Sequence, residues 1–293
     1  MEKVFYFSDN DQCDLWDKMW TSRTVDQELE ACEIESPPRD LFVTYIPKGG
    51  KIIDAGCGFG KWVVYLHRRG YDILGIDSND LAISKLRQFD PTLQVERGEI
   101  LATGYPDHSF DAYISMGVVE HFEDGPQAPL KEAYRILKPG GLIFVSVPTV
   151  NILRQVIRRP LRNAIKRSLT LPSFLNHVAK RHCPLRPDSS DRPVAAGRKT
   201  SCRQFAEYRY TKSELEAFLQ QAGFTIIQTV PHDFYGSRDH AVGLVLDFPF
   251  LGVRGASNFR LNLFGKIISS TLNRVSPWVA CSSVLCVARA KKP

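Results

Sequence analysis

The segment from Lys51 to Val147 constrains the fold most, because short apolar runs alternate in it with stretches of helical spacing. The apolar runs predict five strands, at 51–55, 71–77, 93–97, 109–116 and 142–147. The spacing of apolar residues between them predicts helices at 62–69, 79–89 and 127–137. Strands and helices of this length in alternation indicate βαβ units and a parallel sheet that helices cover on both faces.

The alternation stops after the fifth strand and resumes near Thr211, where Glu214 completes the pattern of a capping box. The helix that begins there is predicted to end at Gly223, and further strands are predicted at 224–230 and 280–288. The sequence therefore predicts an α/β three-layer sandwich with a mostly parallel, seven-stranded sheet and two insertions.

This pattern also predicts how the chain is divided. The expected parts are an N-terminal helical cap at 1–47, a core at 48–148, a basic insertion at 149–205, a core helix and strand at 206–233, a second insertion at 234–275, and a last strand with the tail at 276–293. The second insertion is rich in glycine, proline and aromatic residues, and no regular element is predicted in it.

Three closely spaced glycines, Gly56, Gly58 and Gly60, follow the first predicted strand. Glycines let a backbone turn sharply and approach a ligand without a Cβ clash. Lys61 stands where a dinucleotide fingerprint requires a further glycine, and no Gly-Lys-Ser/Thr follows at the spacing of a P-loop. The turn therefore disfavours both a nicotinamide site and a P-loop.

Asp77 ends the second predicted strand. Ligands of open α/β sheets bind beyond the carboxyl ends of the strands, where a carboxylate can accept hydrogen bonds from a ribose diol. The alternative is that Asp77 caps the helix that follows. The glycine turn upstream favours the ribose role.

Together these residues resemble the class I S-adenosylmethionine-dependent methyltransferases, which have a Rossmann-like, seven-stranded fold. The resemblance covers 48–147 closely and 208–230 more loosely. The matching segments are 54–60, Asp77, 98–99, 110–113, 119–122, 137–141, 207–211 and 222–224.

The resemblance implies S-adenosylmethionine as cofactor. The seven cysteines are scattered and include no Cys-x-x-Cys pair, so no metal site is predicted. The glycines would wrap the methionyl part of the cofactor with Asp54 near the amine, Asp77 would bind the ribose, and Glu99 and Ile100 would flank the adenine. Glu99 stands where the family more often has aspartate. The cofactor residues implied are Asp54, Gly56, Cys57, Gly58, Gly60, Asp77, Ser78, Glu99, Ile100, Met116, Gly117 and Val118, the last three as the pocket wall near the sulfonium.

His121 is the candidate for the base that deprotonates the acceptor, because an imidazole titrates near working pH. The alternative is that it is only part of the pocket architecture. Tyr208 and Tyr210 are candidate polar groups of the acceptor pocket, or they pack against the helix at 211. Trp16 and Trp20 are candidates to close over the cofactor and acceptor, or they belong to the core.

Charge is concentrated in the basic insertion. Residues 149–205 contain thirteen Lys or Arg and two acids, a local charge of +11 in a chain whose formal net charge is +6. Such asymmetry indicates a surface for an anionic partner, or else a solvated loop. At 153–169 an apolar row runs beside a cationic row of Arg154, Arg158, Arg162 and Lys166, which predicts an amphipathic helix. It would contact an anionic membrane, form a lid over the acceptor, or be disordered.

The expected function is methyl transfer from S-adenosylmethionine to a small-molecule, lipid-linked or glycan acceptor, with O-methylation favoured. One alternative is an RNA methyltransferase that uses the basic insertion as a grip. Few aromatics interleave those charges, and the Asn/Asp-Pro-Pro-Tyr signature is absent at 115–118, so nucleic acid is disfavoured. The other alternative is a regulatory protein that binds the cofactor without catalysis. The acceptor atom and the oligomeric state stay open.

The location of the protein is also predicted. The start lacks the apolar region of a signal peptide, and the longest apolar stretches are shorter than a membrane span. The protein is expected to be cytoplasmic, with the segment at 153–169 as the place where it would meet a membrane.

Overall fold

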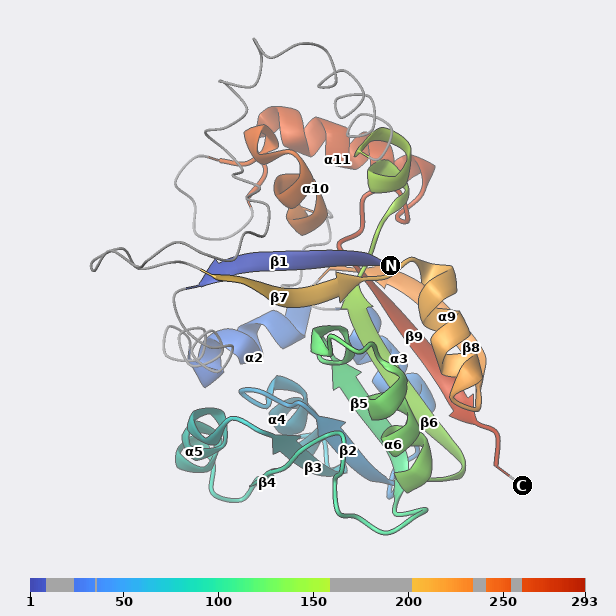
Figure 1. Cartoon of the computed structure of the whole chain (residues 1–293). Helices are drawn as coiled ribbons and strands as arrows, with labels where there is room; N and C mark the ends of the chain where they lie inside the picture. The colour runs from blue at the N-terminus through green and yellow to red at the C-terminus, as the bar shows by residue number, and fades with distance from the viewer. Residues whose placement is uncertain (9–23, 35, 159–201, 234–240, 254–259, 293) are drawn as a thin grey trace, which may run out of the picture.

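In the computed structural model, a central sheet of seven strands lies between two layers of helices (Figure 1). The structure describes residues 1–8, 24–34, 36–158, 202–233, 241–253 and 260–292. The strand order is β4-β3-β2-β5-β6-β9-β8, and β9 runs in the opposite direction to the other six strands. The strands are β2 (Lys51–Ala55), β3 (Asp72–Asp77), β4 (Gln94–Arg97), β5 (Phe110–Met116), β6 (Leu137–Pro148), β8 (Phe224–His232) and β9 (Ser283–Ala290). The predicted α/β fold is confirmed.

The helices bury apolar side chains against both faces of the sheet. Because successive side chains of a strand point to opposite faces, Ile52 of β2 lies in one apolar cluster and Ile53 in the other. The first cluster is covered by α2 (Val25–Ile34), α3 (Ser36–Tyr45), α4 (Lys61–His67) and α5 (Asp80–Phe89). The second is covered by α6 (Gln127–Ile136) and α9 (Lys212–Gln221). This arrangement leaves the carboxyl edge of the parallel strands for a ligand.

Side-chain caps fix the starts of α5 and α9. The Asn79 side chain accepts a hydrogen bond from Ala82 N at 2.9 Å, so Asn79 is the N-cap of α5. Thr211 and Glu214 form the predicted capping box at the start of α9. Since Asn79 provides the cap of α5, the Asp77 carboxylate does not have that role.

The N-terminal part differs from the all-helical cap that the sequence predicts. It begins with β1 (Glu2–Ser8), which pairs antiparallel with β7 (Cys202–Arg209) in a two-stranded ribbon beside the main sheet (Figure 1). The run Val4-Phe5-Tyr6-Phe7 has the β-branched and aromatic composition of a strand, which explains why β1 forms. β7 begins inside the span 149–205, so the basic insertion is interrupted by regular structure before its predicted end.

The second insertion is also more regular than predicted. It contains α10 (Ala241–Asp247), the short 3₁₀ helix η3 (Pro249–Leu251) and α11 (Leu263–Val275), which share a small apolar cluster of their own. A Cβ atom at Gly265 would lie 2.5 Å from the Leu251 carbonyl oxygen, so this glycine lets α11 approach η3 closely. Glycines weaken a helical pattern in sequence, which explains why the prediction missed the helix.

The basic insertion begins as a short helical segment at 152–158. Arg154 does not belong to an exposed cationic row there, as was predicted: it is only 3% exposed, and its Nη1 donates to the Thr149 carbonyl oxygen at 2.8 Å. Burial beside a backbone acceptor is the physical reason for this correction. The remainder of the predicted helix lies outside the described residues. Among the helices that the structure does describe, none has the length and apolar character needed to cross a bilayer.

Candidate active site

The glycine turn, residues 56–60, folds back across the end of β3. The backbone N–H groups of Gly56 and Cys57 both donate to the Ile76 carbonyl oxygen, at 2.8 and 2.9 Å. Gly56 has a φ of +82°, and a Cβ atom on it would lie 2.5 Å from Cγ2 of Val118. Only glycine therefore meets both the backbone angle and the space at this position.

The Asp77 carboxylate binds this turn. Oδ2 accepts from Gly58 N at 2.8 Å, and Oδ1 accepts from Asn79 N at 2.9 Å. Burial raises the pKa of Asp77, while the two N–H donors oppose that rise. Each carboxylate oxygen can accept a further hydrogen bond, so the group can hold a ligand hydroxyl without losing these contacts.

Asp54 is the second acid at the turn and is almost fully buried. Burial, with a smaller contribution from the charge of Asp77, raises the pKa of Asp54 to about 7, and Lys61 opposes the rise. The carboxyl group therefore keeps its proton to a much higher pH than an exposed aspartic acid does. A cationic group placed beside it would favour its charged form.

The residues predicted to hold the adenine follow β4. Gly98 N donates to the Asp77 carbonyl oxygen at 3.1 Å, which brings this segment against the end of β3. Ile100 is buried, whereas Glu99 is exposed and so is Ser78. Ile100 is apolar, so its buried side chain suits contact with one face of an adenine ring.

The pocket wall predicted after β5 lies against the glycine turn. Gly117 has a φ of +79° and its N–H donates to the Ser146 carbonyl oxygen at 2.9 Å. Met116 is half-buried, and Val118 occupies the space beside Gly56. The cofactor residues that the sequence predicts thus converge at the carboxyl ends of β2, β3, β4 and β5.

His121 ends the 3₁₀ helix η1 (Val119–His121) that follows this wall. Its Nδ1 lies 2.8 Å from the Ala206 carbonyl oxygen of β7, so Nδ1 carries a proton and donates. Burial lowers the pKa of His121, and the carbonyls of Ala206 and Gly117 and the charge of Glu207 oppose this. A neutral imidazole with a proton on Nδ1 presents Nε2 as a proton acceptor.

Beside His121 lies a fully buried carboxyl group, Glu120. Its Oε1 is 3.9 Å from His121 Nε2, and its Oε2 has no hydrogen-bond partner within the described residues. Burial raises the pKa of Glu120 well above its usual range, because the charged carboxylate is poorly solvated there.

The two predicted pocket tyrosines differ in what their hydroxyls do. Tyr208 donates to the Glu123 carbonyl oxygen at 2.8 Å and so ties β7 to the loop after η1. Tyr210 is completely buried, and its hydroxyl has no partner within the described residues. Trp16 and Trp20 lie outside the described residues.

Sequence reasoning missed the contribution of β7, which places Ala206 and Glu207 beside His121. The run of β-favouring residues at 4–7 was the available signal for a strand near the start of the chain. Its partner strand could not be read from that run, because pairing between distant segments leaves no local pattern.

The topology and the site together define a class of protein. The strand order reverses between β2 and β5, and the glycine turn and Asp77 lie at this switch point, where open α/β sheets bind their ligands. A seven-stranded sheet with one antiparallel strand, a glycine turn after β2 and an acid after β3 are the features of a class I methyltransferase domain that uses S-adenosylmethionine.

Comparison with known proteins agrees with this class. Residues 53–145 match the family model of a methyltransferase domain. A ubiquinone biosynthesis O-methyltransferase of Pseudomonas putida is 34% identical over 108 residues, which are 35% of this chain and 45% of that protein. The chain thus spans less than half the length of this curated relative.

Two solved structures share the fold. One is a chain from the complex of the Trm112 methyltransferase activator with a methyltransferase of Haloferax volcanii, at 16% identity and a TM-score of 0.53, with 97% of this chain and 99% of that chain covered. The other is a methyltransferase of Methanosarcina mazei, at 18% identity and a TM-score of 0.50, with 85% and 96% covered. At such identities the likeness concerns the fold alone.

Proposed function

We propose that this protein transfers the methyl group of S-adenosylmethionine to an oxygen atom of a small-molecule acceptor, a class that includes lipid-linked and glycan hydroxyls. The observation that carries the proposal is the Asp77 carboxylate, which binds Gly58 N and Asn79 N and keeps acceptor capacity for a ribose diol. The O-methyltransferase relative supports oxygen as the acceptor atom. The basic insertion favours an acceptor that carries negative charge.

Different residues of the chain would bind different parts of the cofactor. Asp77 would hold the ribose hydroxyls, the glycine turn would follow the methionyl part, and the Asp54 carboxylate would attract its ammonium group. Bound S-adenosylmethionine supplies a methyl group attached to a sulfonium, and the neutral thioether that forms is a leaving group that needs no protonation. The protein therefore contributes mainly by alignment of the acceptor and by exclusion of water.

His121 would take the proton of the acceptor hydroxyl at Nε2. The Ala206 carbonyl holds Nδ1–H at 2.8 Å, so the ring orientation and the tautomer are fixed before the acceptor binds. The same carbonyl, the Gly117 carbonyl and Glu207 favour the imidazolium that results. The buried Tyr210 hydroxyl would offer a hydrogen bond to the acceptor.

The test is an acceptor screen with S-adenosylmethionine that carries a labelled methyl group. Phenols, isoprenoid-linked phenols and glycans are incubated with wild-type protein and with Asp77→Ala. The expected product carries the label, and with unlabelled cofactor it is about 14 daltons heavier, the mass of one methylene. At a cofactor concentration near the wild-type Kd, Asp77→Ala is expected to give much less product. Cofactor binding without any labelled product from all three acceptor classes would contradict the proposal.

A further inference from the structure

Helix α11 has an exposed apolar row that the methyltransferase site does not use. Leu263 is 77% exposed, Phe264 59% and Ile267 56%. The opposite side of the helix, with Gly265 and Ser269, is buried and faces the small cluster of the second insertion. Since residues three and four apart share a face of a helix, the exposed residues form a continuous strip.

The strip has apolar neighbours outside the helix. Phe250 in η3 is 69% exposed and Val253 just after it is 47% exposed. Leu251 between them belongs to the same small cluster as Ile268 and Leu272 of α11, so η3 lies against α11. An exposed group of large apolar side chains marks an interaction site.

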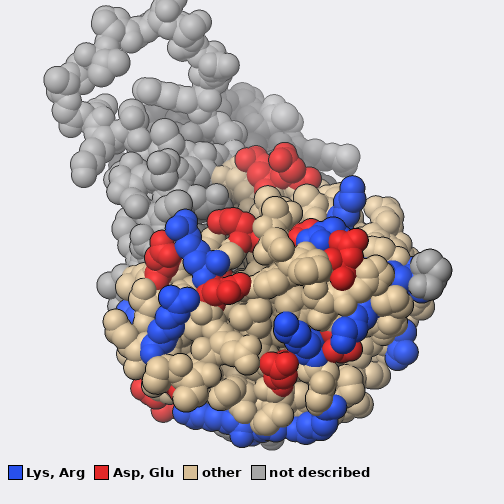
Figure 2. All heavy atoms as spheres, turned by 90° about the horizontal axis from the view of Figure 1, so that it is seen from below, with Lys and Arg blue, Asp and Glu red and all other residues tan. Residues whose placement is uncertain are grey.

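A cationic row runs beside the apolar strip. Lys266, Ser270 and Arg274 follow one another at intervals of four residues, and both cations are exposed. From Phe248 to the end of the sequence there is not one Asp or Glu. The molecular face seen in Figure 2, which lies at the other end from α11, carries interspersed acids and bases instead.

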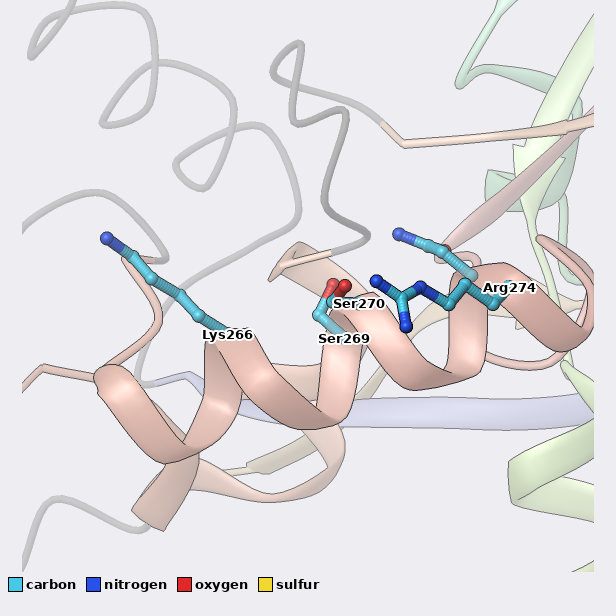
Figure 3. Close-up of a pocket in the computed structure, with 5 residues that line it drawn as sticks. Lys266, Ser269, Ser270 and Arg274 are labelled. Carbon is cyan, nitrogen blue, oxygen red and sulfur yellow. The ribbon is translucent and has the colours of Figure 1, made fainter.

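The cationic row borders a cavity of about 530 Å³, lined by Lys266, Ser269, Ser270, Asn273 and Arg274. Lys266 and Arg274 extend to the same side of α11, with the two serine hydroxyls between them (Figure 3). Ammonium, guanidinium and hydroxyl groups are the donors that bind phosphate oxygens. The cavity therefore suits an anionic phosphate group.

We propose that α11 docks on an anionic phospholipid surface. The strip of Leu263, Phe264 and Ile267 enters the boundary between headgroups and acyl chains, and Lys266 and Arg274 meet the headgroup phosphates. Large apolar residues beside a cationic row are typical of amphipathic helices that lie in this interface. Charge complementarity selects a lipid surface over a second copy of this chain, whose corresponding face is equally cationic.

The proposal concerns residues outside the methyl-transfer site, so its test does not depend on catalysis. Full-length protein is sedimented at low salt with vesicles of two compositions. One contains phosphatidylcholine with roughly 30% phosphatidylglycerol, which makes the surface anionic, and the other contains phosphatidylcholine alone. Binding is expected to the anionic vesicles and to fall as salt rises. Equal binding to both vesicle types would overturn the role of the cationic row.

Matched variants locate the surface. Lys266→Gln with Arg274→Gln is expected to weaken vesicle binding roughly 30-fold, from about fivefold for each cation near an anionic surface. The control Arg68→Gln with Lys131→Gln removes the same charge from exposed positions on the body and leaves binding unchanged. Ile267→Ser is expected to weaken binding roughly tenfold. Its control is Val43→Ser, a β-branched residue that is 53% exposed on helix α3.

Two further measurements test whether misfolding or self-association explains the result. Circular dichroism and the affinity for S-adenosylmethionine are expected to stay at wild-type values in all four variants, which excludes misfolding as a cause. Sedimentation velocity reports the oligomeric state. A wild-type dimer that Ile267→Ser separates, without vesicle binding, would overturn the proposal in favour of contact between copies. Wild-type binding that no α11 variant weakens would overturn it in favour of another segment.

Discussion

Asp77 at the end of β3 and Gly58 in the turn after β2 are joined by a hydrogen bond of 2.8 Å from Gly58 N to Asp77 Oδ2. The Oδ2 atom of Asp77 thus fixes the glycine turn after β2, although Asp77 itself belongs to β3. The residue that would bind the ribose also shapes the loop that would bind the methionyl part. Loss of this side chain is therefore expected to affect the two halves of the cofactor site together.

Asp77→Ala is expected to weaken S-adenosylmethionine binding by roughly 1.5–3 kcal/mol, the range for hydrogen bonds to a charged group. Isothermal titration calorimetry with the cofactor and with its demethylated product measures this. Asp80→Asn is the control, because Asp80 lies only three residues further on and its side chain is 72% exposed. An affinity that Asp77→Ala leaves unchanged means that the ribose assignment is wrong.

Gly56→Ala is expected to destabilise the turn and to abolish cofactor binding. The new Cβ atom would lie 2.5 Å from Val118 Cγ2, and the backbone at φ +82° disfavours any side chain. Adding Val118→Ala relieves the clash but not the backbone strain, so the double variant should regain only part of the lost stability. Urea denaturation of both variants distinguishes the two causes, and full recovery in the double variant would show that strain is negligible.

Asp54→Asn is expected to stabilise the cofactor-free protein more at pH 8 than at pH 5. The pKa of Asp54 is raised to about 7 in the folded state, from about 4 in an unfolded chain. Stability from this group is present below pH 4 and is lost as the pH rises toward 7, because the folded state then holds a proton that the unfolded state has released. With these two pKa values the gain should be about 4 kcal/mol at pH 8 and about 1 kcal/mol at pH 5.

Urea unfolding of wild type and Asp54→Asn at the two pH values is the measurement. The same variant should bind S-adenosylmethionine more weakly than wild type at pH 8, where the wild-type carboxylate is ionised. A stability difference that does not change with pH would contradict the raised pKa of Asp54.

His121→Gln is expected to lower kcat/KM for the acceptor by about 10²–10⁴, the range for general base catalysis. Since burial lowers the pKa of His121, the wild-type rate should decline only below pH 6.5, when the imidazole becomes protonated. That acidic limb should be absent in His121→Gln, while cofactor affinity stays unchanged. If the limb persists in the variant, His121 has a structural role only.

Arg154→Gln is expected to lower the free energy of unfolding by roughly 1.5–3 kcal/mol, because the guanidinium is buried and donates to the Thr149 carbonyl oxygen. Arg68→Gln, which removes an exposed guanidinium, is the matched control. Chemical denaturation measures both. Equal and negligible losses would mean that Arg154 acts as an exposed surface charge, as its place in the sequence pattern suggested.

The central sheet could be predicted because its signals are local. Most of the parallel strands contain a short apolar run. The glycine turn follows one of these runs and Asp77 ends another, so sequence order alone places them at one edge. The capping box of α9 is equally local, since Thr211 and Glu214 lie three residues apart.

Other features depend on contacts that leave no local pattern. The pairing of Val4 with Glu207 joins segments about two hundred residues apart. Arg154 follows a regular cationic spacing, yet a backbone carbonyl five residues earlier holds it inside. Gly265 weakens the helical pattern of α11 in sequence, while in the structure it allows close contact with Leu251. In each case tertiary packing overrides the pattern.

The pairing of β1 with β7 has a consequence for the order of folding. The strands from β2 to β6 follow one another closely in sequence, so their contacts can form early, whereas the ribbon must close a loop of about two hundred residues. The Ala206 carbonyl that orients His121 belongs to this late-forming ribbon. During synthesis the chain would therefore complete the nucleotide side of its site first, and the histidine would gain its fixed orientation only after most of the protein has left the ribosome.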